Sequence, residues 1–450
     1  MPKACWWYPS KSWYCDMKKI IQPPKQEWEA LLARPVQSYD ALEETVALIF
    51  REISESGDAA VKAYTRKFDG ADLETLEVAK SDVDLAADRL SEPLKEAINL
   101  AYANIEAFHR SQQIETRKID TAPGVTCWQE KRPIQKVGLY IPGGTAPLFS
   151  TILMLAIPAR IAGCEEVVLC TPSDQNGQVH PAILYTASLC GVQKIYRIGG
   201  IQAIAAMTFG TESITRVYKI FGPGNQYVTA AKQMAQRYGV AIDLPAGPSE
   251  LLVLADDTAI PAFVASDLLS QAEHGADSQV VLVTTSRELL EQVESEIEVQ
   301  ILELPRRELA SLSMANSRLI CMPDLQEALA LVNAYAPEHL IICHRDEDYF
   351  LEQVQNAGSV FLGNFTPESA GDYASGTNHT LPTNGYARQY SGVNLDSYMK
   401  SITYQRISRS GLQAIGPSIE TMAAAEGLEA HKRAVSLRLE SAGAGNAIKG

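Results

Sequence analysis

The stretch KVGLYIPGGTAPLFSTILMLAIPARIAGCEEVVLC, residues 136–170, decides the fold class. It holds two short β-rich runs, KVGLYIP and EEVVLC, on either side of the apolar segment LFSTILMLAIPARIAG. Its uncharged part, Val137–Ala159, is long enough to cross a bilayer. That part also contains the turn-forming or helix-breaking residues Pro142, Gly143, Gly144, Pro147 and Pro158. We therefore interpret the stretch as a strand, a tight loop and a helix buried in protein, followed by a second strand.

The same alternation continues on the C-terminal side of this stretch. Amphipathic segments separate further β-rich runs, among them KIYRIGG, VYKIFGP, SQVVLVTT, HLIIC and GSVFLGN. Strands that alternate with helices form parallel sheets covered by helices. Residues 38–115 are expected to be helical, with Asp40 as a cap and Gly57 at the end of the first run. We predict an α/β protein with two Rossmann-like parallel-sheet domains and helical N- and C-terminal appendages.

The patterns also predict domain boundaries. Residues 1–16 are interpreted as a tail or a misassigned start, because Met17 offers a second start directly before KKIIQPP. An N-terminal appendage follows at 17–37. The remaining units are a discontinuous first α/β domain (38–139 with 251–392), a second α/β domain (140–250) and a C-terminal helical arm (393–450).

Composition excludes several classes of partner. The chain has 450 residues, with 39 Lys and Arg against 54 Asp and Glu, which gives a formal net charge of -15. This charge repels phosphate backbones and anionic lipid, so we expect no nucleic-acid or membrane partner. The eight cysteines form no C-x-x-C pair, and the N-terminus has no apolar run typical of a signal peptide. We expect a cytoplasmic protein with reduced thiols.

Glycine-rich turns follow three of the expected strands, at 141–144 (IPGG), 197–202 (RIGGIQ) and 221–225 (FGPGN). Glycine lets a backbone approach a ligand closely, and a helix N-terminus that follows attracts phosphate. Three such turns suggest a dinucleotide cleft, although neither G-x-G-x-x-G after a strand nor a P-loop is present. A fourth turn, LPAGPSE at 244–250, offers Ser249.

Histidine is scarce, with seven in the chain. Gln271 and His274 have the i, i+3 spacing that places two side chains on one helix face, within reach of one metal ion. The alternative is a solvated helix end with Gly275 as its cap. Asp372 lies in the polar segment PESAGDYASGTNHT after an expected strand, where α/β sheets place ligands, although a simple turn would use the same residues.

Two further acid–imidazole pairs are present. Glu338 and His339 lie in AYAPEHLII, where Pro337 should end the preceding helix and leave the pair in a loop before a strand. Such a pair suits acid–base chemistry, but surface pairs of this kind are common. Glu426 and His431 lie on a C-terminal helix about 140° apart, so a solvated surface is the simpler interpretation from spacing alone.

Long strings in this chain resemble the histidinol dehydrogenase family. They are VGLYIPGGTAPLFSTILML, FGPGNQYVTAAK, DLPAGPSE, DLLSQAEHGADSQVVL, YAPEHLI, GSVFLGNFTPESAGDYASGTNHTLPT and AAAEGLEAHKRAV, in family order across 137–434. The resemblance implies oxidation of L-histidinol through L-histidinal to L-histidine with two NAD, the last step of histidine biosynthesis. It also implies a cytoplasmic homodimer whose C-terminal arm completes the partner's active site.

The resemblance assigns a role to each of the singled-out residues. It implies a zinc ion held by Gln271, His274, Asp372 and His431. Proton acceptors would be Glu338 and His339. The substrate would contact Ser249, Gln271, His274, His339, Asp372, Glu426 and His431. NAD would contact Tyr140, Gln202 and Asn225, which makes 140–250 the NAD-binding domain.

Three alternatives remain open at this point. A relative with the same machinery could oxidise another small alcohol. A thiol-based aldehyde dehydrogenase would need Cys164 or Cys170, but both lie in an apolar run that suits packing better. A non-catalytic NAD-sensing protein would not need the intact set of proton acceptors.

Overall fold

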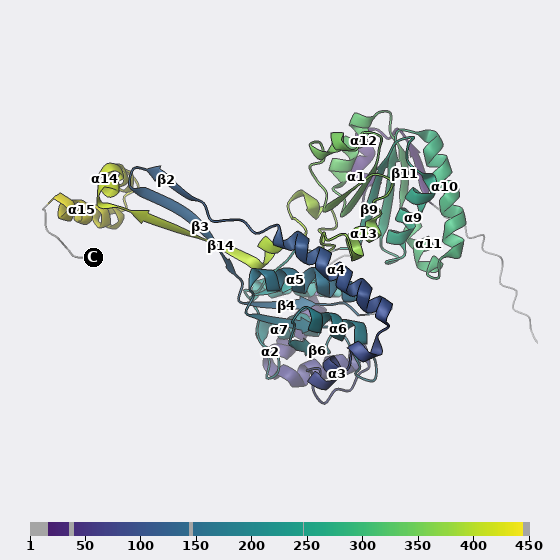
Figure 1. The fold of residues 1–450 in the computed structure, drawn as a ribbon, viewed down its shortest axis with the longest axis horizontal. Coiled ribbons are helices and arrows are strands. Elements are labelled where there is room, and N and C mark those ends of the chain that lie inside the picture. The colour runs from purple at the N-terminus through teal and green to yellow at the C-terminus, as the bar shows by residue number, and fades with distance from the viewer. Residues whose placement is uncertain (1–16, 36–39, 144–146, 246, 444–450) are drawn as a thin grey trace, which may run out of the picture. The chain divides into compact units, whose positions relative to one another are not determined.

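The computed structural model describes residues 17–35, 40–143, 147–245 and 247–443, so the expected tail at 1–16 lies outside the described residues. The chain forms two compact units. The first contains Met1–Gln112 and Gln135–Tyr398, and the second contains Gln113–Ile134 and Met399–Gly450. Figure 1 labels helices and strands of both units.

A five-stranded parallel sheet occupies one half of the first unit. Its strands are β4 (Lys136–Tyr140), β5 (Glu166–Cys170), β6 (Lys194–Tyr196), β7 (Lys219–Phe221) and β8 (Ala241–Ile242), in the order β6-β5-β4-β7-β8. The helices between them are α5 (Phe149–Ala162), α6 (Pro181–Leu189), α7 (Gly200–Phe209) and α8 (Gln226–Arg237). The strand and the helix expected within 137–159 are present as β4 and α5, and α5 is buried over most of its length.

A six-stranded parallel sheet occupies the other half. Its strands are β1 (Lys18–Ile21), β9 (Glu250–Ala255), β10 (Gln279–Thr284), β11 (Arg318–Cys321), β12 (His339–Cys343) and β13 (Ser359–Leu362), in the order β1-β11-β10-β9-β12-β13. The helices are α9 (Pro261–Ala272), α10 (Arg287–Gln300), α11 (Arg307–Ala315), α12 (Leu325–Tyr335) and α13 (Glu368–Tyr373). Apart from the added edge strand β1, both sheets follow one topology, and the predicted fold class is confirmed.

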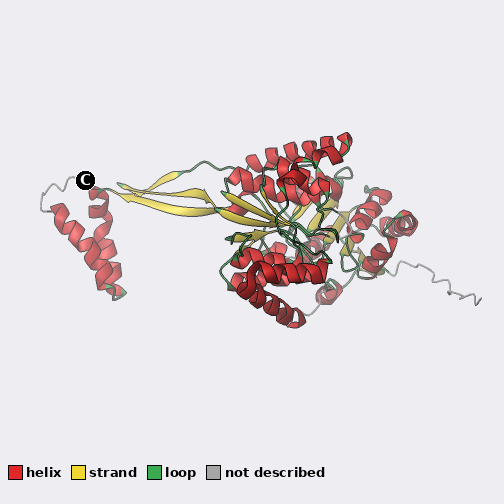
Figure 2. Ribbon diagram, turned by 90° about the horizontal axis from the view of Figure 1, so that it is seen from below, coloured by secondary structure: helices red, strands yellow, loops and turns green. Residues whose placement is uncertain are grey.

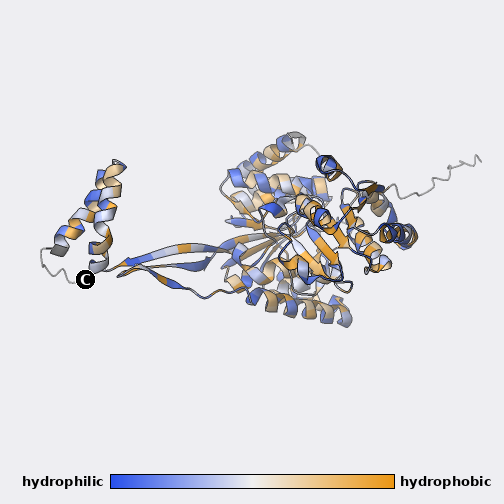
Figure 3. Ribbon diagram, turned by 90° about the horizontal axis from the view of Figure 1, so that it is seen from above, coloured by the Kyte–Doolittle hydropathy of each residue, from blue (hydrophilic) through white to orange (hydrophobic). Residues whose placement is uncertain are grey.

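Helices cover both faces of these strands (Figure 2). Hydrophobic residues gather on the strands and on the helix faces toward them (Figure 3), which is the pattern of buried parallel sheets. Among the described residues, no helix is both long and apolar enough to span a bilayer.

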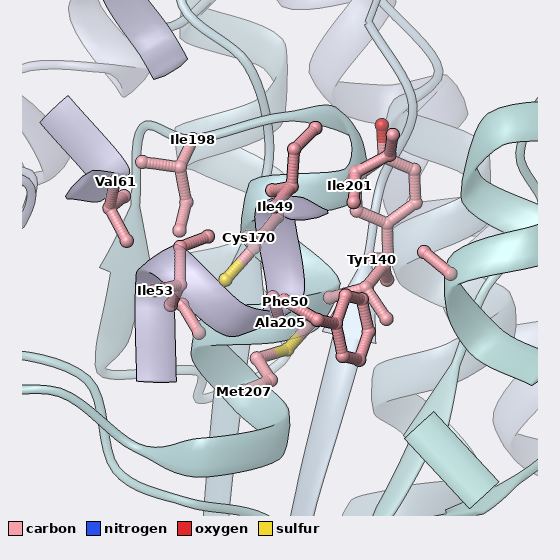
Figure 4. Packing of buried hydrophobic residues seen from close by; sticks show 14 of the residues in the cluster. Ile49, Phe50, Ile53, Val61, Tyr140, Cys170, Ile198, Ile201, Ala205 and Met207 are labelled. Atoms are coloured by element: carbon pink, nitrogen blue, oxygen red, sulfur yellow. The ribbon is translucent and has the colours of Figure 1, made fainter. Parts of the chain in front are cut away.

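The N-terminal helices pack on helices of the five-stranded sheet. Helix α2 (Asp40–Asp69) packs against α7 and α8, and α4 (Glu92–Arg110) packs against α5. Figure 4 shows Phe50 of α2 beside Met207 of α7 in the core of the five-stranded sheet. The helices α2 and α4 therefore pack mainly against helices within 140–250, and α4 also reaches 251–392 through Asn104, which donates to the main-chain oxygen of Ala374 at 2.8 Å. Gly57 (φ 51°) interrupts α2, and the helix resumes after it instead of ending there.

The second unit corrects the expected helical arm at 393–450, because a strand precedes its two helices. Strands β2 (Lys118–Ala122), β3 (Val125–Pro133) and β14 (Met399–Ile407) form an antiparallel sheet in the order β14-β3-β2. The helices α14 (Arg409–Ala425) and α15 (Glu429–Gly443) pack against each other. The expectation missed this sheet because the strand that completes it pairs with residues far away in the sequence. The short helices α1 (Trp28–Leu31) and α3 (Lys80–Asp84) belong to the first unit.

Candidate active site

A cavity of about 750 Å³ lies where the two sheets of the first unit meet. From the five-stranded sheet it is lined by residues that follow β7, among them Asn225. From the six-stranded sheet it is lined by Ser249, just before β9, and by His339, the first residue of β12. The cavity therefore lies at the carboxyl ends of the strands of the five-stranded sheet and at the amino ends of the strands of the six-stranded sheet. This arrangement explains how a pair that precedes a strand reaches the cleft.

His339 is the most enclosed imidazole of the cavity wall, and it is 4% exposed. Its Nδ1 lies 3.2 Å from the main-chain oxygen of Glu250, while Nε2 is buried without a hydrogen-bond partner. Burial lowers the pKa of His339 to about 4, so the ring is neutral near neutral pH. If Nδ1 carries the proton, Nε2 is a free acceptor.

Three carboxylates surround this ring. The Glu338 carboxylate and the Glu368 carboxylate each lie 3.6 Å from Nδ1, and Asp372 Oδ1 lies 3.8 Å from Nε2. Burial raises the pKa of Glu338 and of Glu368 well above the usual carboxyl value. Glu338 Oε2 also accepts a hydrogen bond of 2.9 Å from the main-chain N–H of Glu250. The cluster therefore offers proton acceptors of very different strength in one place.

Asp372 reaches the amino edge of the six-stranded sheet although it follows β13. Helix α13 carries it back toward β12, where it meets His339. The main-chain oxygen of Asp372 lies 2.9 Å from His379 Nδ1, and His379 Nε2 lies 3.3 Å from Thr151 Oγ1. Both His379 and Thr151 line the cavity. The segment around Asp372 is thus tied to helix α5.

Gln271 and His274 lie at the end of α9 and line the same cavity, as does Asp372. Gln271 is buried, and with its amide turned to satisfy its neighbours it donates to Glu368 and accepts from the N–H of Glu250 at 3.3 Å. His274 is exposed. These nitrogen and oxygen donors, with no thiolate, fit the ligand chemistry of a catalytic zinc ion.

Among the described residues, one group of His, Cys, Asp or Glu side chains lies close enough together to hold a metal ion. Ligand atoms of His339, Glu368 and Asp372 lie within 4.8 Å of one another. Asp372 is common to this group and to the expected zinc ligands. Glu368 received no role from the sequence, although its i, i+4 spacing to Asp372 on a helix could have indicated one.

A second cavity of about 1100 Å³ brings together all three expected NAD contacts, Tyr140, Gln202 and Asn225. Pro142 and Asn225 line both cavities, so the two spaces adjoin. The Tyr140 hydroxyl accepts from the N–H of Gly200 at 3.1 Å. Gln202 is buried, donates to Asp69 at 3.3 Å, and its buried Oε1 has no hydrogen-bond partner.

A buried ion pair that the sequence did not indicate shapes the turn after β7. Lys232 Nζ lies 2.5 Å from Asp243 and donates to the Gly222 oxygen at 2.8 Å, while the Gly222 N–H donates to Asp243 at 2.7 Å. Gly222 has φ 128°, and a Cβ there would lie 2.1 Å from the oxygen of Tyr140. Only glycine allows this close approach, which supports the significance given to the FGPGN turn. Of the IPGG turn, Gly144 lies outside the described residues.

Glu426 and His431 belong to the second unit, whereas the other candidate residues belong to the first. Glu426 follows α14 and His431 lies on α15, and both side chains are exposed on that unit. Within this unit, both side chains therefore lie on the surface, as their spacing predicted.

The two cysteines considered as nucleophiles are poor thiolates. Burial raises the pKa of Cys164 to about 12 and that of Cys170 further, so both remain protonated near neutral pH. Neither residue lines the two cavities described above. The thiol-based alternative has no support in this geometry.

Comparisons with known proteins agree along nearly the whole chain. A family model described as histidinol dehydrogenase matches residues 32–439. A histidinol dehydrogenase from Bacteroides fragilis is 60% identical over 424 residues, covering 94% of this chain and 99% of the relative. One from Salmonella typhimurium is 51% identical over 421 residues, covering 93% and 96%. The crystal structure of histidinol dehydrogenase from Elizabethkingia anophelis matches with a TM-score of 0.93 at 56% identity, covering 95% of this chain and 98% of that one.

Proposed function

Because the chain belongs to the histidinol dehydrogenase family, we propose that it oxidises L-histidinol to L-histidine through L-histidinal, reducing two NAD in succession. This is the last step of histidine biosynthesis, and we place it in the cytoplasm. One observation carries the proposal: the buried His339, whose Nε2 has no hydrogen-bond partner, lines a cavity that adjoins the one containing all three expected NAD contacts. A proton acceptor and a cofactor space thus meet at one substrate-sized cleft.

Substrate and NAD occupy the two adjoining cavities in this proposal. NAD binds along Tyr140, Gln202 and Asn225, where the unpartnered Gln202 Oε1 can accept a hydrogen bond. Histidinol binds in the smaller cavity against Ser249, with its carbinol carbon toward Asn225. Because the two cavities adjoin at Asn225, the carbinol carbon can lie against the nicotinamide ring, so that hydride transfers directly to NAD.

His339 acts in the first oxidation. Its Nε2 accepts the hydroxyl proton while the carbinol carbon gives its hydride to NAD, which yields the aldehyde and NADH. The lowered pKa of His339, about 4, keeps the ring neutral and able to accept that proton near neutral pH.

Glu338 acts in the second oxidation. It takes a proton from the water that adds to the aldehyde, and the resulting hydrate loses hydride to a second NAD to give the carboxylic acid. The raised pKa of Glu338 makes it a stronger base than an ordinary carboxylate once it is ionised. Each NAD takes up two electrons, which accounts for the four lost by the alcohol.

We assign the zinc site to Gln271, His274 and Asp372 of the first unit together with His431 of the arm. A zinc ion held there would act as a Lewis acid and orient the imidazole and amine of the substrate. These residues and His339 would also contact the substrate. The nitrogen and oxygen donors that line the cavity support this assignment.

We further propose a homodimer in which each arm supplies Glu426 and His431 to the site of the partner subunit. Both residues are exposed on a unit that has its own sheet and helices. Apolar side chains are exposed on the same unit, Met422 at 65% and Leu437 at 50%, and contact with a second copy would bury such surface. An arm that docks on a second copy would make this contact.

The decisive experiment follows NADH absorbance with purified protein, L-histidinol and NAD. Two NADH formed per L-histidine supports the proposal. The runner-up function is oxidation of another small alcohol on the same machinery, and a panel of amino alcohols and diols tests it. Faster turnover of any panel member than of histidinol would overturn the substrate assignment, and absence of NADH with every substrate would overturn the enzyme assignment.

A further inference from the structure

The Glu250 carboxylate joins three segments of chain behind the substrate cavity. Glu250 begins β9, and its side chain is 2% exposed. Arg34 donates to both of its oxygens, through Nε at 2.5 Å and through Nη2 at 2.8 Å. The main-chain N–H of Asn384 donates to Oε1 at 2.5 Å. This carboxylate is therefore held by three donors and cannot move independently of Arg34.

Arg34 is itself firmly held. Its guanidinium carbon lies 4.0 Å from the centroid of the Tyr335 ring, and Nη2 also donates to the main-chain oxygen of Tyr335 at 2.8 Å. The Tyr335 hydroxyl donates to Gln279 at 2.8 Å, so the ring is fixed as well. A planar guanidinium can stack and donate to a carboxylate through two nitrogens at once, whereas a lysine ammonium cannot.

The main chain of Glu250 contacts both proposed proton acceptors. Its N–H donates to Glu338 Oε2 at 2.9 Å, and its carbonyl oxygen lies 3.2 Å from His339 Nδ1. The first bond orients the carboxylate, and the second favours the tautomer that leaves Nε2 as acceptor. A displacement of Glu250 would therefore disturb both groups together.

We infer that Arg34 is a positioning residue for the oxidation, because it fixes Glu250 and thereby the Glu338 carboxylate and the His339 imidazole. The inference rests on the proposed function of that pair. Removing Arg34 would leave a buried carboxylate without its charged partner, a costly state that the start of β9 can relieve only by shifting. A shift of about 1 Å at reacting groups is worth about 10²-fold in rate.

The test is single-turnover NADH formation with enzyme in excess over L-histidinol, whose rate constant does not depend on the fraction of inactive protein. Arg34→Met should slow this step by about 10²-fold while KM for histidinol and NAD changes by less than about threefold. Arg34→Lys keeps the positive charge but cannot donate to Glu250 through two planar nitrogens, so it should be slower than the wild type and faster than Arg34→Met. Lys19→Met, which removes an exposed ion pair with Glu294 at the edge of the same sheet, is the matched control and should retain the wild-type rate.

Glu250→Gln changes the other partner of the same ion pair, and it should also slow the single-turnover step. In the double variant with Arg34→Met the two effects should not add, because both substitutions break one interaction. If Arg34→Met does not fold, Arg34→Lys and Glu250→Gln make the comparison in its place. A wild-type rate constant in folded Arg34 or Glu250 variants, even with lower thermal stability, would overturn the inference. So would an effect confined to KM. If the wild type forms no NADH from histidinol, it is the proposed function that fails.

Discussion

His339 Nε2 lies 3.8 Å from Asp372 Oδ1, with the imidazole supplied by the start of β12 and the carboxylate by α13. The nitrogen proposed to accept the substrate proton therefore faces a carboxylate proposed to bind zinc. An alcohol oxygen placed to one side of this pair could lie within hydrogen-bond distance of both groups. The short distance between the two atoms means that proton transfer and substrate orientation would take place side by side in one site.

The two proton acceptors should divide the two oxidations. His339→Asn should suppress NADH formation from histidinol strongly, because nothing else in the cluster offers an unpartnered neutral nitrogen to the hydroxyl. Glu338→Gln should suppress the histidinal step more than the histidinol step. Positioned base catalysis is worth about 10²–10⁴-fold, so each loss should be severe in a folded protein. Single-turnover assays with each substrate separate the effects, and equal losses in both steps for both variants would falsify the division.

The two half-reactions should also differ in their dependence on pH. A base works only when unprotonated, so activity falls as pH drops through its pKa. Burial raises the pKa of Glu338 well above the usual carboxyl value and lowers that of His339 to about 4. Histidinal oxidation should therefore lose activity at a higher pH than histidinol oxidation does. Rate–pH profiles for both substrates test this order, and in Glu338→Gln the acid loss specific to histidinal should disappear.

Metal content should depend on the residues at the end of α9. His274→Asn is expected to lower bound zinc and activity in parallel, since it removes one proposed ligand from an exposed position that tolerates substitution. Elemental analysis beside turnover measures both. Glu273→Gln, a neighbouring change outside the proposed ligand set, serves as the control. Full activity in protein stripped of metal would refute the metal role.

Subunit mixing should reveal whether the arm completes a partner's site. A His431→Asn variant and a His274→Asn variant are each expected to be inactive. Heterodimers between them would contain one site with both defects and one intact site, so mixing and exchange should restore up to about half the activity per exchanged dimer. Two affinity tags allow the heterodimer to be purified. An inactive heterodimer would rule out a site shared between subunits.

The sequence predicted the two sheets because parallel strands are buried on both faces and appear as short apolar runs. It did not predict which sheet the N-terminal helices cover. The apolar face of α2 indicates that this helix is partly buried. The sequence pattern does not show that its partner is α7, because that contact depends on the tertiary fold. The sheet β14-β3-β2 was not predicted for the same reason, because β14 pairs with β3, which is far away in the sequence.

The candidate site was predictable in residue identity rather than in geometry. Motifs indicated Glu338, His339 and Asp372, yet their spacing could not show that α13 returns to the amino edge of its sheet. No sequence pattern indicated a role for Arg34. It lies in a short N-terminal segment, and its partner Glu250 is far away in the sequence. Buried ion pairs between distant residues form only when the chain is folded, so neither partner is conspicuous alone.

The arm sheet has a consequence for the order of events during synthesis. Strands β2 and β3 leave the ribosome early, but β14 follows only after the whole of 135–398 has been made. Until then β3 presents an unpaired edge, which is a template for pairing with another chain. A late part of the chain, β14, therefore closes this edge of β3. Slow elongation near the C-terminus would lengthen the interval in which nascent chains can pair incorrectly.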